Sequence, residues 1–208
     1  SKNYKMDTPN NKNNSVGSNN WVLSGKRTKN KVPILANDPH LNLSLPAIWY
    51  LMHLKSPTIN VMGVTIPGSP GIIIGFNDNI SWGVTNGYDD VMDWNEINFY
   101  DSNKKEYFYD NQWLSTDEVI EEIKIKNYGT FYDTIIYTHH GPVMWDEQYH
   151  PESINIEKKT GLALQWTAHD STNELLSFYL LNKASNYNEF KQSLENYDCP
   201  GQNFIYSD

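Results

Sequence analysis

The residues whose types and spacing could best carry out chemistry are Gly17 and Ser18, where a polar tail meets an apolar strand. Cleavage of the peptide bond between them would leave Ser18 with a hydroxyl and a free α-amine. An α-amine has a pKa of about 7.7–8.0, so much of it is a neutral base near physiological pH. Such a serine would carry both a nucleophile and the base that activates it. An ordinary strand serine after a loop glycine is the alternative reading.

The composition excludes several classes of function. The chain has 208 residues, a formal net charge of −9 and a single arginine, Arg27, so a nucleic-acid partner is not expected. Cys199 is the only cysteine, which excludes an internal disulfide and a thiolate metal cluster. No apolar run approaches the roughly 20 residues that a membrane span requires.

The elements that must position Ser18 are mostly strands. Residues 1–17 are rich in Asn and Lys and are predicted to form a linker. Alternating or apolar runs predict strands over 21–24, 32–36, 61–66, 71–76, 80–84, 96–100, 121–126, 130–137 and 203–206, and a hairpin over 107–114. Residues 46–54 are ambiguous between a strand and a short helix.

Helices are predicted late in the chain. The run from Ser171 to Glu174 has the spacing of a capping box, and Asn186 with Glu189 repeats that signal. The whole pattern predicts a β-rich α+β fold in which residues 18–208 form the structured part.

Four segments in register resemble the start of the β chain of the penicillin acylase family of N-terminal-nucleophile hydrolases. They are Ser18-Asn19-Asn20-Trp21-Val22, Ala36-Asn37-Asp38-Pro39-His40-Leu41, Ile80-Ser81-Trp82-Gly83-Val84-Thr85-Asn86 and Asp90-Val91-Met92-Asp93-Trp94. The resemblance implies a four-layer αββα sandwich, incomplete in this chain. Residues 18–208 would be the N-terminal part of the acylase β-chain domain.

The resemblance also implies a self-processing amidohydrolase. Ser18 would become the N-terminal nucleophile after autoproteolysis at the Gly17–Ser18 bond, with its α-amine as the base. His40 matches a position that contacts this amine or the substrate amide. Asn86 matches the residue whose backbone N–H forms half of an oxyanion hole. The second donor, an asparagine side chain, and a nearby arginine would lie beyond residue 208.

Further positions carry implied binding roles. Leu41 and Ile74 match the lining of the acyl pocket, where aliphatic side chains would admit a longer or aliphatic acyl group; buried Leu and Ile are otherwise ordinary core residues. Asp90, Met92 (through its carbonyl) and Asp93 match a structural calcium site, since Ca²⁺ takes 6–8 oxygen ligands. An acidic turn facing water is the alternative. No cofactor is expected for catalysis.

Four further histidines have no support from the resemblance. His53, His139, His150 and His169 are predicted to be structural or to lie on the surface.

The resemblance also implies the partners and the location. The substrate would be a small acyl amide, the other partners would be the α chain and the rest of the β chain of one precursor, and the protein would be periplasmic or extracellular. With the Gly17–Ser18 bond intact, the chain is predicted to be uncleaved and inactive.

Two alternatives stay open. One is a non-catalytic β-rich carbohydrate-binding module, which burial of Trp21, Trp82 and Trp166 in a sheet would disfavour. The other is a degenerate relative that keeps the fold without processing itself.

Overall fold

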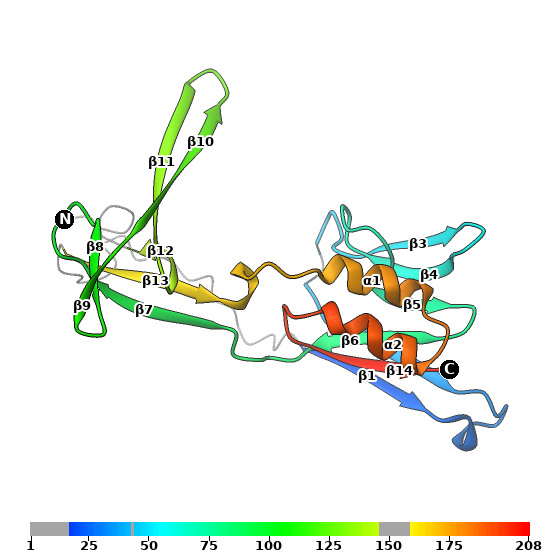
Figure 1. Ribbon diagram of the computed structural model, residues 1–208. Helices are drawn as coiled ribbons and strands as arrows, with labels where there is room; N and C mark the ends of the chain where they lie inside the picture. Colours follow the sequence, from blue (N-terminus) through cyan, green and yellow to red (C-terminus); the bar gives the residue numbers. More distant parts are fainter. Residues whose placement is uncertain (1–16, 43, 146–158) are drawn as a thin grey trace. The chain divides into compact units, whose positions relative to one another are not determined.

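The computed structural model describes residues 17–42, 44–145 and 159–208 and divides them into two compact units (Figure 1). Unit 1 comprises the described residues up to Asp89 together with Thr172–Asp208, and unit 2 comprises Asp90–Ser171. Of the linker predicted over 1–17, only Gly17 lies within the described residues.

Unit 1 contains an antiparallel five-stranded sheet and a separate two-stranded ribbon. The sheet order is β14-β6-β5-β4-β3, and the ribbon pairs β1 with β2. The strands are β1 (Ser18–Leu23), β2 (Ile34–Pro39), β3 (Tyr50–Lys55), β4 (Asn60–Thr65), β5 (Ile74–Asn77), β6 (Ser81–Asn86) and β14 (Gln202–Ser207). The helical elements are α1 (Glu174–Lys183), α2 (Tyr187–Ser193) and the 3₁₀ turns η1 (Gly25–Arg27) and η3 (Leu194–Asn196).

The hydrophobic core of unit 1 lies between the helices and the five-stranded sheet. Its buried members are Val61, Ile72, Ile73, Ile80, Trp82, Phe178, Leu181, Ala184 and Phe190. Trp82 is fully buried, and its indole N–H donates to the Ile73 carbonyl over 2.9 Å. Because adjacent strand residues point to opposite faces, Gly83 faces away from the helices, and there the β1–β2 ribbon packs against β6. Helices, sheet and ribbon are thus successive layers of an incomplete αββα arrangement.

The helix caps agree only in part with the sequence signals. Asn186 is the N-cap of α2, and its side chain accepts from the Glu189 N–H over 3.1 Å, as the spacing predicted. In α1 the N-cap is Asn173, which accepts from the Leu176 N–H over 3.2 Å. Glu174 is therefore the first helical residue rather than the fourth of a capping box, because its carboxylate is engaged outside the helix.

Unit 2 is a second antiparallel sheet, of order β10-β11-β12-β13-β7, with a β8–β9 hairpin. The elements are β7 (Met92–Asn98), β8 (Glu106–Tyr109), β9 (Gln112–Ser115), β10 (Asp117–Ile125), β11 (Gly129–Thr138), β12 (Gly141–Trp145), β13 (Thr160–Trp166) and the 3₁₀ turn η2 (Thr167–His169). Its buried core contains Ile97, Phe99, Tyr107, Val143 and Ala163. The long β10–β11 hairpin extends from the rest of the unit (Figure 1).

Most predicted strands are confirmed, with shifted ends. β3 begins within the ambiguous run over 46–54 and ends one residue beyond it, and the strand predicted over 71–76 begins only at Ile74. The hairpin turn at Asp110 and Asn111 is confirmed, with φ values of 46° and 60°. These positive values are typical of the tight turns that Asp and Asn tolerate.

A buried asparagine joins α1 to the segment between β4 and β5, and its removal should destabilise unit 1. Asn182 accepts from the Ile72 N–H and donates to the Ile72 carbonyl, both over 2.7 Å. Asn182→Ala leaves both buried backbone groups unpaired, at about 1–3 kcal/mol each. We expect urea denaturation to show a loss of at least about 2 kcal/mol in unfolding free energy.

The exposed Asn79 provides the matched control for this change. Asn79→Ala should alter stability by no more than about 0.5 kcal/mol. Equal losses for the two variants would contradict the assignment of Asn182 as a structural bridge.

Candidate active site

The β1–β2 ribbon holds both residues of the predicted cleavage site. Ser18 is the first residue of β1 and lies opposite Pro39. The His40 backbone N–H donates to the Gly17 carbonyl oxygen over 3.0 Å, which extends the ladder by one residue. A side chain added at Gly17 would meet no heavy atom within 4 Å. The carbonyl of the Gly17–Ser18 bond is therefore held by the end of β2, while the space next to the Gly17 Cα is empty.

An asparagine docks this ribbon onto β6. Asn37 Nδ2 donates to the Val84 carbonyl over 3.0 Å. The Asn37 side chain occupies the space that a Cβ on Gly83 would need, so only glycine permits this close approach. The contact places β1, and with it Ser18, beside the strand that ends at Asn86.

A cavity of about 370 Å³ brings together four of the predicted site residues. They are Ser18, Leu41, Ile74 and Asn86. The rest of the wall is mainly apolar and is formed by Pro39, Trp49, Ile66, Ile73, Val84, Thr85, Glu174, Phe178, Tyr197, Cys199, Pro200 and Gln202. The volume and the apolar lining are those of a small-molecule site.

The backbone N–H of Asn86 points away from β14. The residue after Asn86, Gly87, donates its N–H to the Gly201 carbonyl over 2.9 Å, on the β14 side of β6. Val84, two residues before Asn86, accepts from Asn37 through its carbonyl on the opposite edge of β6. Backbone groups of successive strand residues point to alternate edges, so the Asn86 N–H shares the edge of Val84. The Asn86 side chain is engaged elsewhere, since its Oδ1 accepts from the Tyr88 N–H over 2.8 Å.

The imidazole of His40 does not line this cavity in the structure. His40 Nε2 lies 2.8 Å from Asp38 Oδ2, and both side chains are largely exposed. The backbone of His40, rather than its side chain, contacts the cleavage site. The catalytic role predicted for the imidazole remains a prediction.

Glu174 and Tyr197 are cavity residues whose position sequence reasoning missed. The Thr172 hydroxyl, 2.6 Å from Glu174 Oε1, is the main cause that lowers the pKa of this carboxyl. Burial, reinforced by the charge of Glu174, raises the pKa of Tyr197 to about 12. The capping-box spacing was the only signal at Glu174, and it indicated a helix end rather than a cavity wall.

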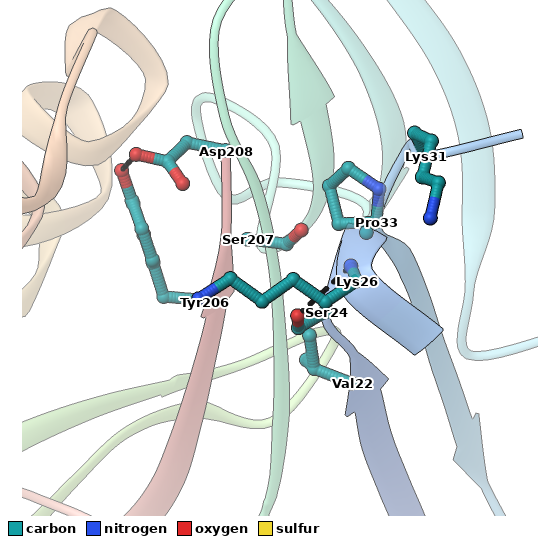
Figure 2. Close-up of a pocket in the computed structure, with 9 residues that line it drawn as sticks. Val22, Ser24, Lys26, Lys31, Pro33, Tyr206, Ser207 and Asp208 are labelled. Carbon is teal, nitrogen blue, oxygen red and sulfur yellow. Dashed lines mark hydrogen bonds between the residues drawn. The ribbon is translucent and has the colours of Figure 1, made fainter. Parts of the chain in front are cut away.

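A second hollow, of about 730 Å³, lies at the opposite end of the ribbon. Figure 2 shows the Tyr206 hydroxyl bonded to Asp208 and the Lys26 N–H bonded to Ser24 at its walls. Lining residues also include Val22, Gly25, Lys31, Pro33 and Ser207. None of the predicted site residues lines this hollow, so the cavity beside Ser18 is the candidate active site.

The three predicted calcium ligands lie in unit 2. Asp90 and Asp93 line one polar hollow of about 350 Å³. The Val91 carbonyl accepts from the Thr167 N–H over 3.1 Å, so the Met92 carbonyl points to the edge of β7 away from β13. Among the described residues, no three His, Cys, Asp or Glu side chains are arranged to hold a metal ion by themselves.

Three of the remaining histidines contact neighbouring side chains. His139 Nδ1 lies 2.8 Å from the Tyr107 hydroxyl, and burial with the neighbouring His140 lowers the pKa of His139. His53 bonds Asn60 over 2.8 Å, and His169 packs edge-on against Trp166. His150 lies outside the described residues.

The layered α+β fold of unit 1 matches the β-rich part of an N-terminal-nucleophile hydrolase fold. A sequence profile of the penicillin amidase family matches residues 2–208. The chain therefore belongs to the penicillin amidase family.

Individual relatives agree with this assignment. The acyl-homoserine lactone acylase QuiP of Pseudomonas aeruginosa is 28% identical over 198 residues, 93% of this chain and 23% of that protein. The penicillin acylase 2 proenzyme of a Pseudomonas species is 42% identical over 55 residues, 26% of this chain and 7% of that protein. The chain thus spans about a quarter or less of the length of these relatives.

A solved structure shares the fold. The thermostable penicillin G acylase from Alcaligenes faecalis superimposes with a TM-score of 0.76 at 25% identity, covering 91% of this chain and 33% of that one. Separately, no helix of the described residues is long and apolar enough to cross a membrane.

The close packing of Gly83 against Asn37 should appear as energetic coupling. Gly83→Ala forces the added methyl into Asn37, and overpacking of this kind costs about 1–3 kcal/mol. In an Asn37→Ala background the same change should cost less, because the Oδ1 and Cγ atoms that lie nearest the added methyl are removed and only the Cβ of residue 37 stays close. We expect a coupling energy of about 0.5–3 kcal/mol from urea denaturation of the single and double variants. Simple additivity would show that the contact does not hold the ribbon.

Proposed function

We propose that the protein is an amidohydrolase of the penicillin acylase type, in which Ser18 hydrolyses acyl amides after the Gly17–Ser18 bond is cut. The observation that carries the proposal is the position of Ser18. It lines an apolar cavity, while the Gly17 carbonyl before it accepts a hydrogen bond from the His40 N–H at the end of β2. Family membership supports the reaction class.

The proposed maturation step uses the same serine. Ser18 Oγ attacks the carbonyl carbon of Gly17, and the acyl group moves from nitrogen to oxygen. This shift breaks the peptide C–N bond and frees the amine of Ser18. Water then hydrolyses the resulting ester, releasing a carboxylate at Gly17 and restoring the Ser18 hydroxyl. The His40 N–H, already 3.0 Å from the Gly17 oxygen, is placed to stabilise the charge that develops there. The proenzyme named among the relatives supports a precursor.

The proposed catalytic cycle follows from the new N-terminus. The hydroxyl of Ser18 attacks the substrate carbonyl carbon, and the α-amine accepts the proton and passes it to the leaving amine. The Asn86 N–H supplies one oxyanion donor, a kind of contact whose loss costs about 3 kcal/mol of transition-state stabilisation. Water then cleaves the acyl ester of Ser18 and releases the acid.

The imidazole of His40 is proposed to orient the free α-amine. Its bond to Asp38 fixes the ring at the end of β2, next to the backbone N–H that contacts Gly17. This role requires the ring to turn toward the amine once the Gly17–Ser18 bond is open.

The acyl group is proposed to occupy the apolar part of the cavity. Leu41 and Ile74 are aliphatic and leave room beside Ser18. An aliphatic acyl chain fits this lining, and the acyl-homoserine lactone acylase among the relatives supports such a substrate. The other proposed partners are the α chain and the remainder of the β chain, with the mature protein exported to the periplasm or the extracellular space.

Replacement of the nucleophile should block maturation. Ser18→Ala removes the attacking hydroxyl, so we expect the encoded protein to keep its full precursor mass and to release no acid from an acyl amide. Intact-mass spectrometry and an amidase assay measure the two effects. Unchanged protein, with the Gly17–Ser18 bond intact, is also expected to be inactive until it is cut.

Ser24→Ala, at the far end of the ribbon, is the matched control and should process normally. Cleavage before residue 18 in the alanine variant would rule out self-processing by this serine. A wild-type protein that never cleaves would favour the degenerate-relative alternative.

A structural calcium ion is proposed at Asp90, Met92 and Asp93. Two carboxylates and an outward backbone carbonyl are the hard oxygen donors that Ca²⁺ prefers, and the remaining ligands would come from elsewhere in the acylase. Such an ion would stabilise the turn that leads into β7 and would take no part in catalysis.

Calcium should therefore raise thermal stability through these carboxylates. We expect the unfolding temperature of the full protein to rise on adding Ca²⁺ and to fall with a chelator. Asp93→Asn should remove most of this response, whereas Asp110→Asn, in the β8–β9 turn, should keep it. An identical response in both variants would place the ion elsewhere.

A further inference from the structure

Among the described residues that line the candidate cavity, Glu174 has the only charged side chain. Glu174, the first residue of α1, lines the cavity together with Phe178 of the same helix and Tyr197. No Lys, Arg or His side chain is among the described residues that line this cavity. Within the described residues, a charged group of a bound substrate would therefore meet the negative charge of Glu174 and no Lys, Arg or His side chain.

The carboxylate of Glu174 is held in its charged form. Its Oε1 accepts from the Thr172 hydroxyl over 2.6 Å and from the Cys199 and Asp198 N–H groups over 3.1 and 3.4 Å. These hydrogen bonds favour the anion and lower the pKa of the carboxyl. At neutral pH Glu174 is consequently an anion at a fixed position.

The field of this anion reaches the inner wall. Tyr197, which is partly buried beside Phe178, has its pKa raised by burial first and by the charge of Glu174 second. A substrate group at the same depth would experience the same sign of potential. Attraction for a cation and repulsion of an anion follow.

Resting on the proposed amidohydrolase function, we propose that Glu174 determines charge specificity in this cavity, disfavouring substrates whose acyl chain ends in a carboxylate relative to neutral or cationic ones. The apolar wall accepts the methylene chain, and Glu174 discriminates at the charged end. A purely structural role, tying α1 to the loop before β14, is the competing explanation.

Binding of three chain-matched amides tests the proposal without turnover. Hexanamide, adipic acid monoamide and 6-aminohexanamide carry neutral, anionic and cationic ends on chains of equal length. They are titrated into the full-length protein carrying Ser18→Ala, which is expected to remain an uncleaved precursor, with Gly17 and residue 18 joined as in the structure, and to hydrolyse none of them. The NMR signal of the Trp49 indole N–H, assigned with Trp49→Phe, reports occupancy of the cavity.

The expected order of affinity is cationic, then neutral, then anionic. Steps of about fivefold correspond to charge interactions of about 1 kcal/mol. Glu174→Gln keeps an acceptor for Thr172 and Cys199 but removes the charge, so it should bring the three affinities together. The matched control is Glu189→Gln, which alters a similarly hydrogen-bonded carboxylate of α2 that lies outside the cavity, and it should keep the order.

The outcomes separate the two proposals. Equal affinities in the parent protein, an unchanged order in the Glu174 variant, or no binding of any amide would overturn the charge-specificity role. Discrimination that depends on Glu174, in a protein whose parent hydrolyses no acyl amide, would uphold this role and refute the proposed function.

Discussion

The contact between Asn37 and β6 is the constraint on which the candidate site depends. The β1–β2 ribbon lies outside the five-stranded sheet and shares no ladder with it. A side-chain amide bonded to the Val84 carbonyl, seated on a glycine, fixes its approach. Ser18 reaches the cavity only because the ribbon is docked in this way, and the Asn86 end of β6 is brought to the same place.

The wall of the cavity is mainly apolar and contains few polar groups. Apolar side chains from the sheet and from α1 supply the volume, while Ser18, the Asn86 backbone and Glu174 supply polarity from three separate elements. In such a setting each polar group has a large effect, because the surrounding side chains screen charge poorly. The hollow of unit 2 differs, since aspartates and histidines line it together.

Local signals in the sequence predicted local structure well. The Asp110-Asn111 turn and the Asn186 cap depend on neighbouring residues, and both are confirmed. Strands that depend on distant partners were harder to place. β12 and β13 were not predicted, and β3 was ambiguous, because their strand character comes from pairing within a sheet rather than from a periodic pattern. Burial of three tryptophans would have disfavoured a carbohydrate-binding module, but only Trp82 of the three is buried. Family membership, rather than tryptophan burial, therefore decides against that alternative.

The sequence by itself determined the family and the candidate residues, since the four motifs are contiguous in the chain and need no folding to be read. It also determined the fold class, because the same resemblance implies the αββα arrangement. Only the tertiary structure decided which candidates meet. Ser18, Leu41, Ile74 and Asn86 share one cavity, whereas the imidazole of His40 turns to Asp38 and its backbone contacts Gly17 instead. Only the tertiary structure shows that Glu174 lines the same cavity. A cavity wall is assembled from segments more than a hundred residues apart, and the packing that unites them leaves no local pattern in the sequence.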